Sequence, residues 1–263
     1  MEVYTLADSL LNTVIVTGAA NGIGKATVEQ YLTSTAATVL AIDLDEQALQ
    51  ALKNSVAEEK QSRLVTLALD LTDEINSTHA YEKILERYST VDHIIISHGV
   101  GYENSVNDND KWDQILATNL VSTQRLLSYF IDTIIDGGRI VIVSSILGRV
   151  GQVNNTGYVT SKHALLGLTK ALALDVARRE ITVNSILPAW VNTPMLIEEL
   201  DKQALQLGVP TKKLIRKAKK QIPLRKLVTP EDIAAAIHFF VSPSASMITA
   251  QSLIVDGGTS CGI

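Results

Sequence analysis

The stretch TVIVTGAANGIG, Thr13–Gly24, decides the fold. Its first five residues are all β-branched and predict a buried strand, and the residues after the glycines predict the start of a helix. A glycine-rich turn between a strand and a helix presents backbone N–H groups at a helix N-terminus, where they can bind a phosphate. Gly18 permits the turn, Gly22 lets the backbone approach the phosphates, and Gly24 lets the helix pack on the strand. In this strand–turn–helix context the glycines predict a dinucleotide site.

Outward from this turn, short β-branched runs alternate with longer amphipathic stretches. The strands are apolar on both faces, as expected when helices cover both sides of a parallel sheet. The sequence therefore predicts an α/β fold, a doubly wound parallel sheet of the Rossmann type. The expected strands are Thr13–Thr17, Thr38–Ile42, Leu64–Ala68, His93–Ser97, Arg139–Val143, Thr182–Leu187 and Ser252–Val255. The expected helices are Gly24–Thr33, Glu46–Glu59, Ser77–Tyr88, Trp112–Ile135, Tyr158–Arg178 and Pro230–Phe240.

One segment breaks the alternation, because no strand is expected from about 195 to 227. We interpret it as a small helical insertion that covers the substrate, a lid. The chain has 263 residues and no composition shift or linker, which fits one domain over 1–263 better than two.

Composition narrows the class of protein. The net charge of −5 gives no general case for nucleic acid. Met1–Asn12 lacks the pattern of a signal peptide, and no run of about 18 apolar residues predicts a membrane span. Cys261 is the only cysteine, so no intrachain disulfide can form. We therefore expect a cytoplasmic protein with no nucleic-acid or membrane partner and no metal.

The end of the second expected strand carries Asp43 and Asp45, and Asp43 lies 25 residues after Gly18. A carboxylate there can accept hydrogen bonds from both ribose hydroxyls of an adenosine and repels a 2′-phosphate. We expect Asp43 to bind and Asp45 to cap the next helix, so the cofactor is NAD. Asp70 ends the third strand, where it either receives the adenine amino group or closes a turn with Thr72.

Tyr158 and Lys162 lie four residues apart at the start of an expected helix, so they share one face. A free tyrosine has a pKa of about 10, and a nearby ammonium favours its phenolate. Ser145 follows the Ile140–Val143 run, at the carboxyl end of a strand, where α/β sheets bind ligands. Asn119 lies inside an expected helix, where a buried amide satisfies a neighbour and could hold a water behind the lysine.

Two further motifs lie later in the chain, Pro188 with Val191-Asn192-Thr193-Pro194, and Val255-Asp256-Gly257-Gly258. With these, the chain from about 13 to 258 resembles the classical short-chain dehydrogenase/reductase family. The resemblance implies an oxidoreductase in which Tyr158 is the general acid/base and Lys162 lowers its pKa and holds the nicotinamide ribose. It further implies that Ser145 binds the carbonyl oxygen and that Asn119 supports a proton relay.

The resemblance also implies the residues around each ligand. The cofactor residues are Gly18, Asn21, Gly22, Ile23, Gly24, Asp43, Leu44, Asp70, Leu71, Ser97, Gly99, Tyr158, Lys162, Val191 and Thr193, and the substrate residues are Ser145, Gln152, Tyr158, Trp190 and Met195. Ser97-His98-Gly99 replaces the usual Asn-Ala-Gly, and Pro188-Ala189 replaces Pro-Gly. We interpret His98 as a structural residue and expect a different local path at Ala189.

The segment from Lys202 to Lys226 holds nine basic residues and no acidic one. Either it is a solvated helix face, or it attracts an anionic substrate such as a small hydroxy acid. The expected function is hydride transfer between NAD and a secondary alcohol or ketone. A 3-oxoacyl thioester reductase and a catalytically silent nucleotide-binding protein stay open as alternatives. Apolar residues cover more than one stripe of the helices Trp112–Ile135 and Tyr158–Arg178, and with the resemblance they predict a homotetramer.

Overall fold

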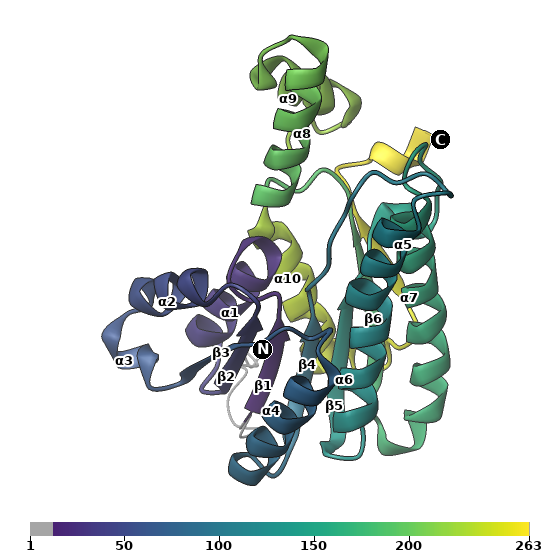
Figure 1. Ribbon diagram of the computed structural model, residues 1–263. Coiled ribbons are helices and arrows are strands. Elements are labelled where there is room, and N and C mark those ends of the chain that lie inside the picture. The colour runs from purple at the N-terminus through teal and green to yellow at the C-terminus, as the bar shows by residue number, and fades with distance from the viewer. Residues whose placement is uncertain (1–12, 263) are drawn as a thin grey trace, which may run out of the picture.

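The computed structural model describes residues 13–262. Seven parallel strands form one sheet in the order β3-β2-β1-β4-β5-β6-β7, with helices on both faces (Figure 1). The chain reverses its direction across the sheet between β1 and β4, and in doubly wound folds ligands bind at the carboxyl ends of the strands beside this point. The strands are β1 Thr13–Thr17, β2 Thr38–Asp43, β3 Leu64–Ala68, β4 Val91–Ile96, β5 Ile134–Val143, β6 Thr182–Pro188 and β7 Ser252–Val255.

The helices divide by the face they cover. Residues of α1, α2 and α10 belong to the hydrophobic core on one face, and residues of α4, α6 and α7 belong to the core on the other. Two helices, α8 and α9, project beyond the sheet at the end where β6 finishes (Figure 1). The helices are α1 Gly22–Ser34, α2 Glu46–Ser55, α3 Glu58–Gln61, α4 Glu74–Arg87, α5 Asn109–Leu116, α6 Ser122–Phe130, α7 Thr156–Asp175, α8 Pro194–Leu207, α9 Thr211–Gln221 and α10 Pro230–Val241.

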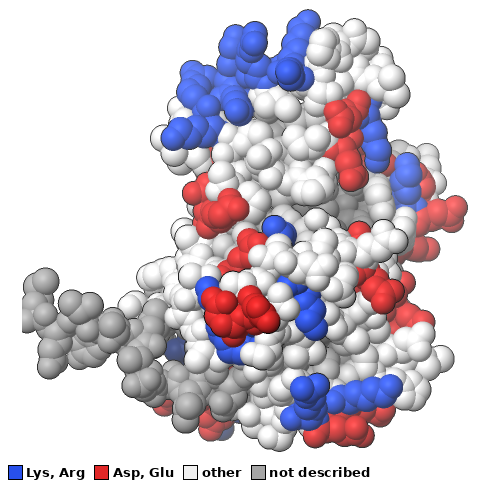
Figure 2. Space-filling view, turned by 90° about the vertical axis from the view of Figure 1, so that its left-hand side faces the viewer, with Lys and Arg blue, Asp and Glu red and all other residues white. Residues whose placement is uncertain are grey.

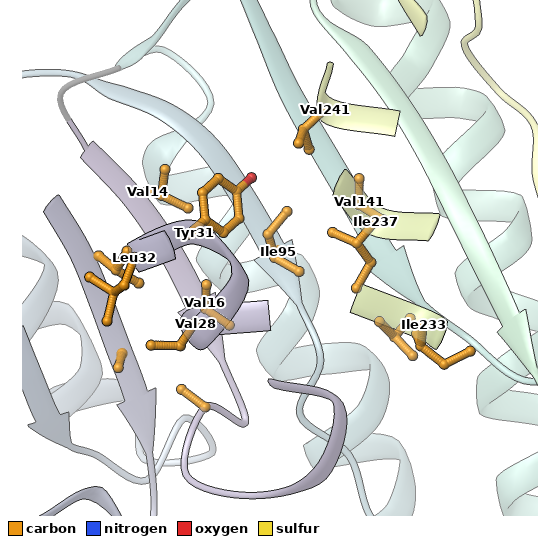
Figure 3. Packing of buried hydrophobic residues seen from close by; sticks show 14 of the residues in the cluster. Val14, Val16, Val28, Tyr31, Leu32, Ile95, Val141, Ile233, Ile237 and Val241 are labelled. Carbon is orange, nitrogen blue, oxygen red and sulfur yellow. The ribbon is translucent and has the colours of Figure 1, made fainter. Parts of the chain in front are cut away.

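The β1 strand shows why the sequence is apolar on both faces. Val14 and Val16 belong to the core under α1 and α10, whereas Ile15 belongs to the opposite core. Figure 3 shows Val14 and Val16 beside Tyr31 of α1, with Ile237 of α10 across from them. All five residues of β1 are buried, so the strand that ends at the glycine-rich turn is fixed from both sides.

The expected helix Trp112–Ile135 is wrong in two respects. It is divided into α5 and α6 by a π-helical turn, Ala117–Val121, and it ends at Phe130. At this π-helical turn, the Thr123 hydroxyl donates a hydrogen bond to the Asn119 carbonyl over 3.0 Å. Residues from Ile134 onward belong to β5, because Ile134 pairs with Val91 on the neighbouring strand.

The expected bounds of β1, β3 and β7 are confirmed, and the remaining expected elements are confirmed with shifted ends, with one exception. The helix expected over Glu46–Glu59 is two helices, because the chain is extended at Val56. The last helix begins with a capping box between Thr229 and Asp232. The insertion expected over 195–227 contains α8 and α9, where Ala218 and Ile222 are buried and Leu214 is half-buried.

Candidate active site

The glycine-rich turn is closely packed where its glycines lie. Gly18 and Gly22 have φ values of +62° and +51°, which favour glycine. A Cβ atom on Gly24 would overlap the carbonyl oxygen of Gly18 and lie 2.6 Å from the carbonyl carbon. A Cβ on Gly22 would lie 2.9 Å from the Thr193 Cγ2 atom. The turn therefore needs all three glycines, and Gly22 faces the residue that caps α8 as well as the open side of the turn.

The N-terminus of α1 fits an anion such as a pyrophosphate. The first turn of α1 holds no acidic side chain, and the Asn21 side chain makes no capping hydrogen bond. The free N–H groups and the positive end of the helix dipole are therefore not neutralised within the chain. Ile23 packs against the core behind this helix end.

Asp43 and Asp45 make different contacts, and Asp45 is the helix cap that the sequence predicts. The Asp45 carboxylate accepts from the Ala48 N–H over 2.9 Å and caps α2. The Asp43 carboxylate accepts from the Ala20 N–H over 2.9 Å and from the Asp45 N–H over 3.1 Å. Both Asp43 oxygens are thus held at the end of β2 beside the glycine-rich turn, with lone pairs left for a ribose. The neighbouring Leu44 side chain is exposed.

Asp70 closes a turn with Thr72, which is one of its two expected roles. Its Oδ1 atom accepts from the Thr72 N–H over 2.8 Å and from the Thr72 hydroxyl over 2.6 Å. Leu71 is buried in the core, so its side chain does not face solvent. Asp70 is an exposed residue that follows the carboxyl end of β3.

Ser145, Tyr158 and Lys162 come together at the carboxyl end of β5. Ser145 follows the strand and its hydroxyl accepts from the Leu147 N–H over 3.1 Å. Lys162 is buried, and its Nζ donates to the Val143 carbonyl over 3.1 Å. The Nζ atom also lies 5.5 Å from the centre of the Tyr158 ring. A phenol, a hydroxyl and an ammonium therefore meet where the fold places ligands.

Within this chain the net shift of the Tyr158 pKa is upward, so the lowering expected from Lys162 stays a prediction. Burial raises the pKa of Tyr158 above 10, a hydrogen bond from Ser145 lowers it, and the Glu199 carboxylate raises it. Burial also lowers the pKa of Lys162 to about 8, because the ammonium is removed from water. Burial therefore favours the protonated phenol, and a further positive charge beside it would favour the phenolate.

Asn119 holds the loop after β4 in place. Its side-chain oxygen accepts from the Val100 N–H over 2.7 Å, and its amide donates to the Val100 carbonyl over 2.9 Å. The amide also donates to the Ser161 hydroxyl over 3.0 Å. Both the loop and α7 are thereby fixed to the π-helical turn. Sequence reasoning missed Ser161, although it lies in the same helical stretch as Tyr158 and Lys162.

His98 has partners on both ring nitrogens. The Thr17 hydroxyl lies 2.7 Å from Nδ1, and the Ser122 hydroxyl lies 2.8 Å from Nε2. Since Ser122 donates its own proton to the Thr118 carbonyl, it accepts from Nε2–H and leaves Nδ1 to accept from Thr17. Burial, and then the Lys162 charge, lower the pKa of His98 to about 4. His98 is therefore a neutral link between β1 and α6, which confirms its interpretation as structural.

After β6 the chain turns at Trp190, the residue that follows Ala189. Ala189 is buried, and it is Trp190 that has a positive φ, 51°. The Trp190 carbonyl accepts from the Val228 N–H, and Val191 forms an isolated bridge with Val228. This strained residue is held by its neighbours, and it directs the chain to Thr193, the N-cap of α8.

Of the expected substrate residues, Tyr158 and Met195 lie side by side, whereas Gln152 lies in an exposed loop. A Cβ on Gly101 would lie 3.4 Å from the Tyr158 ring and 3.9 Å from the Met195 sulfur, so these two side chains meet at Gly101. Gln152 is exposed in the loop before α7.

The expected cofactor residues after β4 are Ser97 and Gly99. Gly99 faces Asn119 and Lys162, since a Cβ there would lie 3.1 Å from the amide oxygen and 3.5 Å from Nζ. Ser97 donates its N–H to the Thr17 hydroxyl.

Within residues 13–262, no group of three or more His, Cys, Asp or Glu side chains is placed to hold a metal ion. None of the helices described there is long and apolar enough to cross a membrane.

Comparison with known proteins covers almost the whole chain. A family model described as Enoyl-(Acyl carrier protein) reductase matches residues 18–260. The short-chain dehydrogenase anuF of Penicillium roqueforti is 31% identical over 97% of this chain and 98% of its own. The 3-oxoacyl-[acyl-carrier-protein] reductase FabG of Thermotoga maritima is 32% identical over 93% of this chain and 96% of its own.

The fold matches solved structures equally well. A short-chain dehydrogenase family protein from Francisella tularensis superposes with a TM-score of 0.86 at 27% identity, covering 95% of this chain and 99% of its own. Coverage of this extent leaves no large segment of either chain unmatched.

Proposed function

The chain belongs to the short-chain dehydrogenase/reductase family, whose members are oxidoreductases that bind a nicotinamide cofactor, and we propose that it transfers a hydride between NAD and a secondary alcohol or ketone. The observation that carries the proposal is the meeting of Tyr158, Ser145 and Lys162 at the end of β5. The bound cofactor supplies or accepts the hydride. The side chains supply the proton transfer and bind the substrate oxygen.

Tyr158 takes the proton of the alcohol, or returns it to the ketone, as a general acid/base. Its ring packs at Gly101 beside Met195. A substrate oxygen bound at the Tyr158 hydroxyl is therefore close to the first turn of α8. Ser145, which lowers the pKa of Tyr158 through a hydrogen bond, donates to the substrate oxygen as charge develops on it. The positive charge of an oxidised nicotinamide, added to that of Lys162, favours the phenolate that burial opposes.

Lys162 is held by the Val143 carbonyl and by burial. From this place its ammonium binds the nicotinamide ribose, and Asn119 with Ser161 keeps α7 in the matching position. Asn119 also supports the relay of the proton to solvent. Val191 and Thr193 bind the nicotinamide half, a role supported by the contact between Thr193 and the glycine-rich turn.

The choice of NAD over NADP rests on Asp43. Its two oxygens are fixed by backbone N–H groups beside the turn and accept from the ribose hydroxyls, whereas a 2′-phosphate would meet a negative charge. The same carboxylate argues against the alternative, a 3-oxoacyl thioester reductase, because those reductases usually take NADPH. The remaining cofactor contacts are assigned to Asn21, Ile23, Leu44, Asp70, Leu71, Ser97 and Gly99.

The substrate is a small secondary alcohol or ketone, in contact with Gln152, Trp190 and Met195. We treat residues 1–263 as one domain in which α8 and α9 form a lid over this substrate. The basic segment from Lys202 to Lys226 suggests an anionic substrate such as a small hydroxy acid as one alternative. All six Lys and Arg side chains of α9 are exposed, which favours a solvated face over a binding surface.

The protein is further proposed to be a cytoplasmic homotetramer. Leu126, Leu127 and Phe130 are buried in the chain's own core, but Leu174 of α7 is 76% exposed and Val121 is 39% exposed. Exposed apolar side chains on these helices are consistent with a contact between subunits. Light scattering that shows a stable monomer at micromolar concentration would contradict this part of the proposal.

The test is a spectrophotometric screen of secondary alcohols and hydroxy acids with NAD and NADP in parallel. The proposal expects NADH formation with at least one alcohol and at least tenfold lower catalytic efficiency with NADP. Failure of every substrate with both cofactors, in protein shown to bind NADH, would favour the catalytically silent alternative.

A further inference from the structure

Glu199 is an exposed residue of α8, one helical turn after a side chain that reaches the proposed site. Met195, in the first turn of α8, meets the Tyr158 ring at Gly101. Glu199 follows Met195 by four residues, so the two side chains share one face of the helix, about one turn apart. The Gln203 amide, another turn along, donates to the Glu199 carboxylate over 3.2 Å and orients it.

A second carboxylate approaches the same place from the other side. Glu103 lies two residues beyond Gly101 in the loop after β4. The next residue, Asn104, ties this loop to the start of α7, because its side-chain oxygen accepts from the Gly157 N–H over 3.0 Å and its amide donates to the Thr156 hydroxyl over 3.1 Å. Glu103 is therefore placed relative to Tyr158 by backbone that is anchored beside Tyr158.

The charges of these groups act on one another. Burial, and then the Glu103 charge, raise the pKa of Glu199, and the Glu199 charge in turn contributes to the raised pKa of Tyr158. Glu199 is thus within electrostatic range of both the phenol and the second carboxylate, which agrees with its position on α8.

Neither carboxylate is neutralised by a cation in the part of the chain that the structure describes. The ion pairs found there do not include Glu103 or Glu199. Lys111 donates to the Glu103 backbone carbonyl but pairs with the Asp108 carboxylate. Figure 2 shows Lys and Arg side chains gathered along the top of the molecule, where Figure 1 places α9, with acidic side chains below them. The basic surface therefore lies beyond the acidic one as seen from the sheet.

We propose that Glu199 is a specificity-determining residue that accepts a hydrogen bond from a second hydroxyl of an uncharged, hydroxyl-rich substrate and disfavours carboxylates. This inference rests on the proposed function, because it places the reacting carbinol at Tyr158. A hydroxyl a few bonds from that carbinol can reach the next turn of α8. A carboxylate at the same position meets one or two negative charges without a cation between them.

The test compares two ligands that differ only at this position. Butane-1,3-diol and 3-hydroxybutyrate share the methyl group and the secondary carbinol, and they differ in a terminal hydroxymethyl or carboxylate. Each is added as a competitive inhibitor or alternative substrate of the best alcohol found in the screen. The wild-type protein is expected to bind the diol at least about tenfold more tightly than the acid.

The variant Glu199→Gln removes the charge while keeping the length of the side chain. It is expected to reduce the preference for the diol about tenfold, mainly through tighter binding of the acid. Glu198→Gln is the matched control, since Glu198 is the adjacent carboxylate, is likewise exposed and does not share the helix face of Met195, and it should keep the wild-type preference. Unfolding midpoints establish that both variants are folded.

The outcomes separate the two proposals. A wild-type protein that binds the acid as tightly as the diol, or a Glu199→Gln variant with the wild-type preference, would overturn the inference while alcohol oxidation stands. A folded wild-type protein that oxidises no alcohol would contradict the proposed function, and the inference with it, before any variant is compared.

Discussion

The floor of the candidate site and the α8–α9 segment, Pro194–Gln221, are built in opposite ways. On the floor, Asn119, Ser161, Lys162 and His98 each bond to partners from another segment of the chain. On α9, the basic side chains point into solvent, and Ala218 is the only residue of the helix that is fully covered. Leu205 and Leu207 at the end of α8 are likewise exposed.

The contrast teaches where chemistry and selectivity are determined. The groups proposed to transfer the proton and to bind the cofactor come from packed elements. Burial there is the largest cause of the shifted pKa values of Tyr158 and Lys162. Groups that meet variable parts of a substrate come from a helix pair that can vary without disturbing the sheet. Substitutions on the floor should therefore cost turnover or folding, and those on α8–α9 should change substrate preference alone.

The largest effect is expected on the floor, for Tyr158→Phe. Loss of the hydroxyl removes the group that handles the substrate proton, and turnover should fall by about 10² to 10⁴-fold. Binding of NADH, followed by its fluorescence, should change little because the ring and Lys162 remain. A variant that keeps more than about a third of the wild-type rate, with chemistry rate-limiting, would remove Tyr158 from its proposed role.

The next effect concerns folding at the glycine-rich turn. Gly24→Ala places a methyl group against the Gly18 carbonyl, and the overlap with backbone should lower the free energy of unfolding by about 3 kcal/mol or more. Gly167→Ala is the matched control: nothing lies within 4 Å of a Cβ there, and alanine in a helix should stabilise by up to about 1 kcal/mol. Urea unfolding measures both. Equal stability of the two variants would show that the turn is not packed as described.

A smaller effect is expected at the adenosine end. Asp43→Asn removes the negative charge that repels a 2′-phosphate, and the preference for NAD over NADP should fall about tenfold. Asp45→Asn is the control, because asparagine caps a helix as well as aspartate and Asp45 serves as the α2 cap. Catalytic efficiencies with the two cofactors give the answer. An unchanged preference in Asp43→Asn would leave Asp43 as a turn residue.

The smallest effect is expected on α9. Replacement of Lys212, Lys213, Arg216 and Lys217 together by glutamine should change the KM of the best substrate less than about twofold, since these side chains are exposed and salt screens charges beyond about 8–10 Å. Steady-state kinetics at low and high salt provide the measurement. A raised KM at low salt with unchanged kcat would instead favour steering of an anionic substrate by α9.

Much of the fold and of the site could be predicted because it depends on local pattern. The β-branched runs predict the seven strands, and the spacing of Tyr158 and Lys162 predicts their shared helix face. The break at Asn119 could not be predicted, because it depends on bonds to Val100 and to the Thr123 hydroxyl. Periodicity alone continues a helix through such a point.

Effects that depend on burial were also beyond the sequence. The spacing of Tyr158 and Lys162 gives their proximity but not the desolvation that raises the pKa of the phenol. The partners of His98 come from β1 and α6, which are distant in sequence. Glu199 belongs to no sequence motif. It can be recognised only because Met195, one helical turn earlier on α8, lies at Gly101 beside the Tyr158 ring.

The most direct test of the central claim follows the hydride itself. The ketone product of the best alcohol is incubated with NADH that carries deuterium at the transferred position of the nicotinamide ring, and the alcohol formed is analysed by mass spectrometry and NMR. The account predicts one deuterium on the carbinol carbon with the wild-type protein and almost no alcohol with Tyr158→Phe, which still binds the NADH. Alcohol formed without deuterium, or labelled equally fast by Tyr158→Phe, would contradict it.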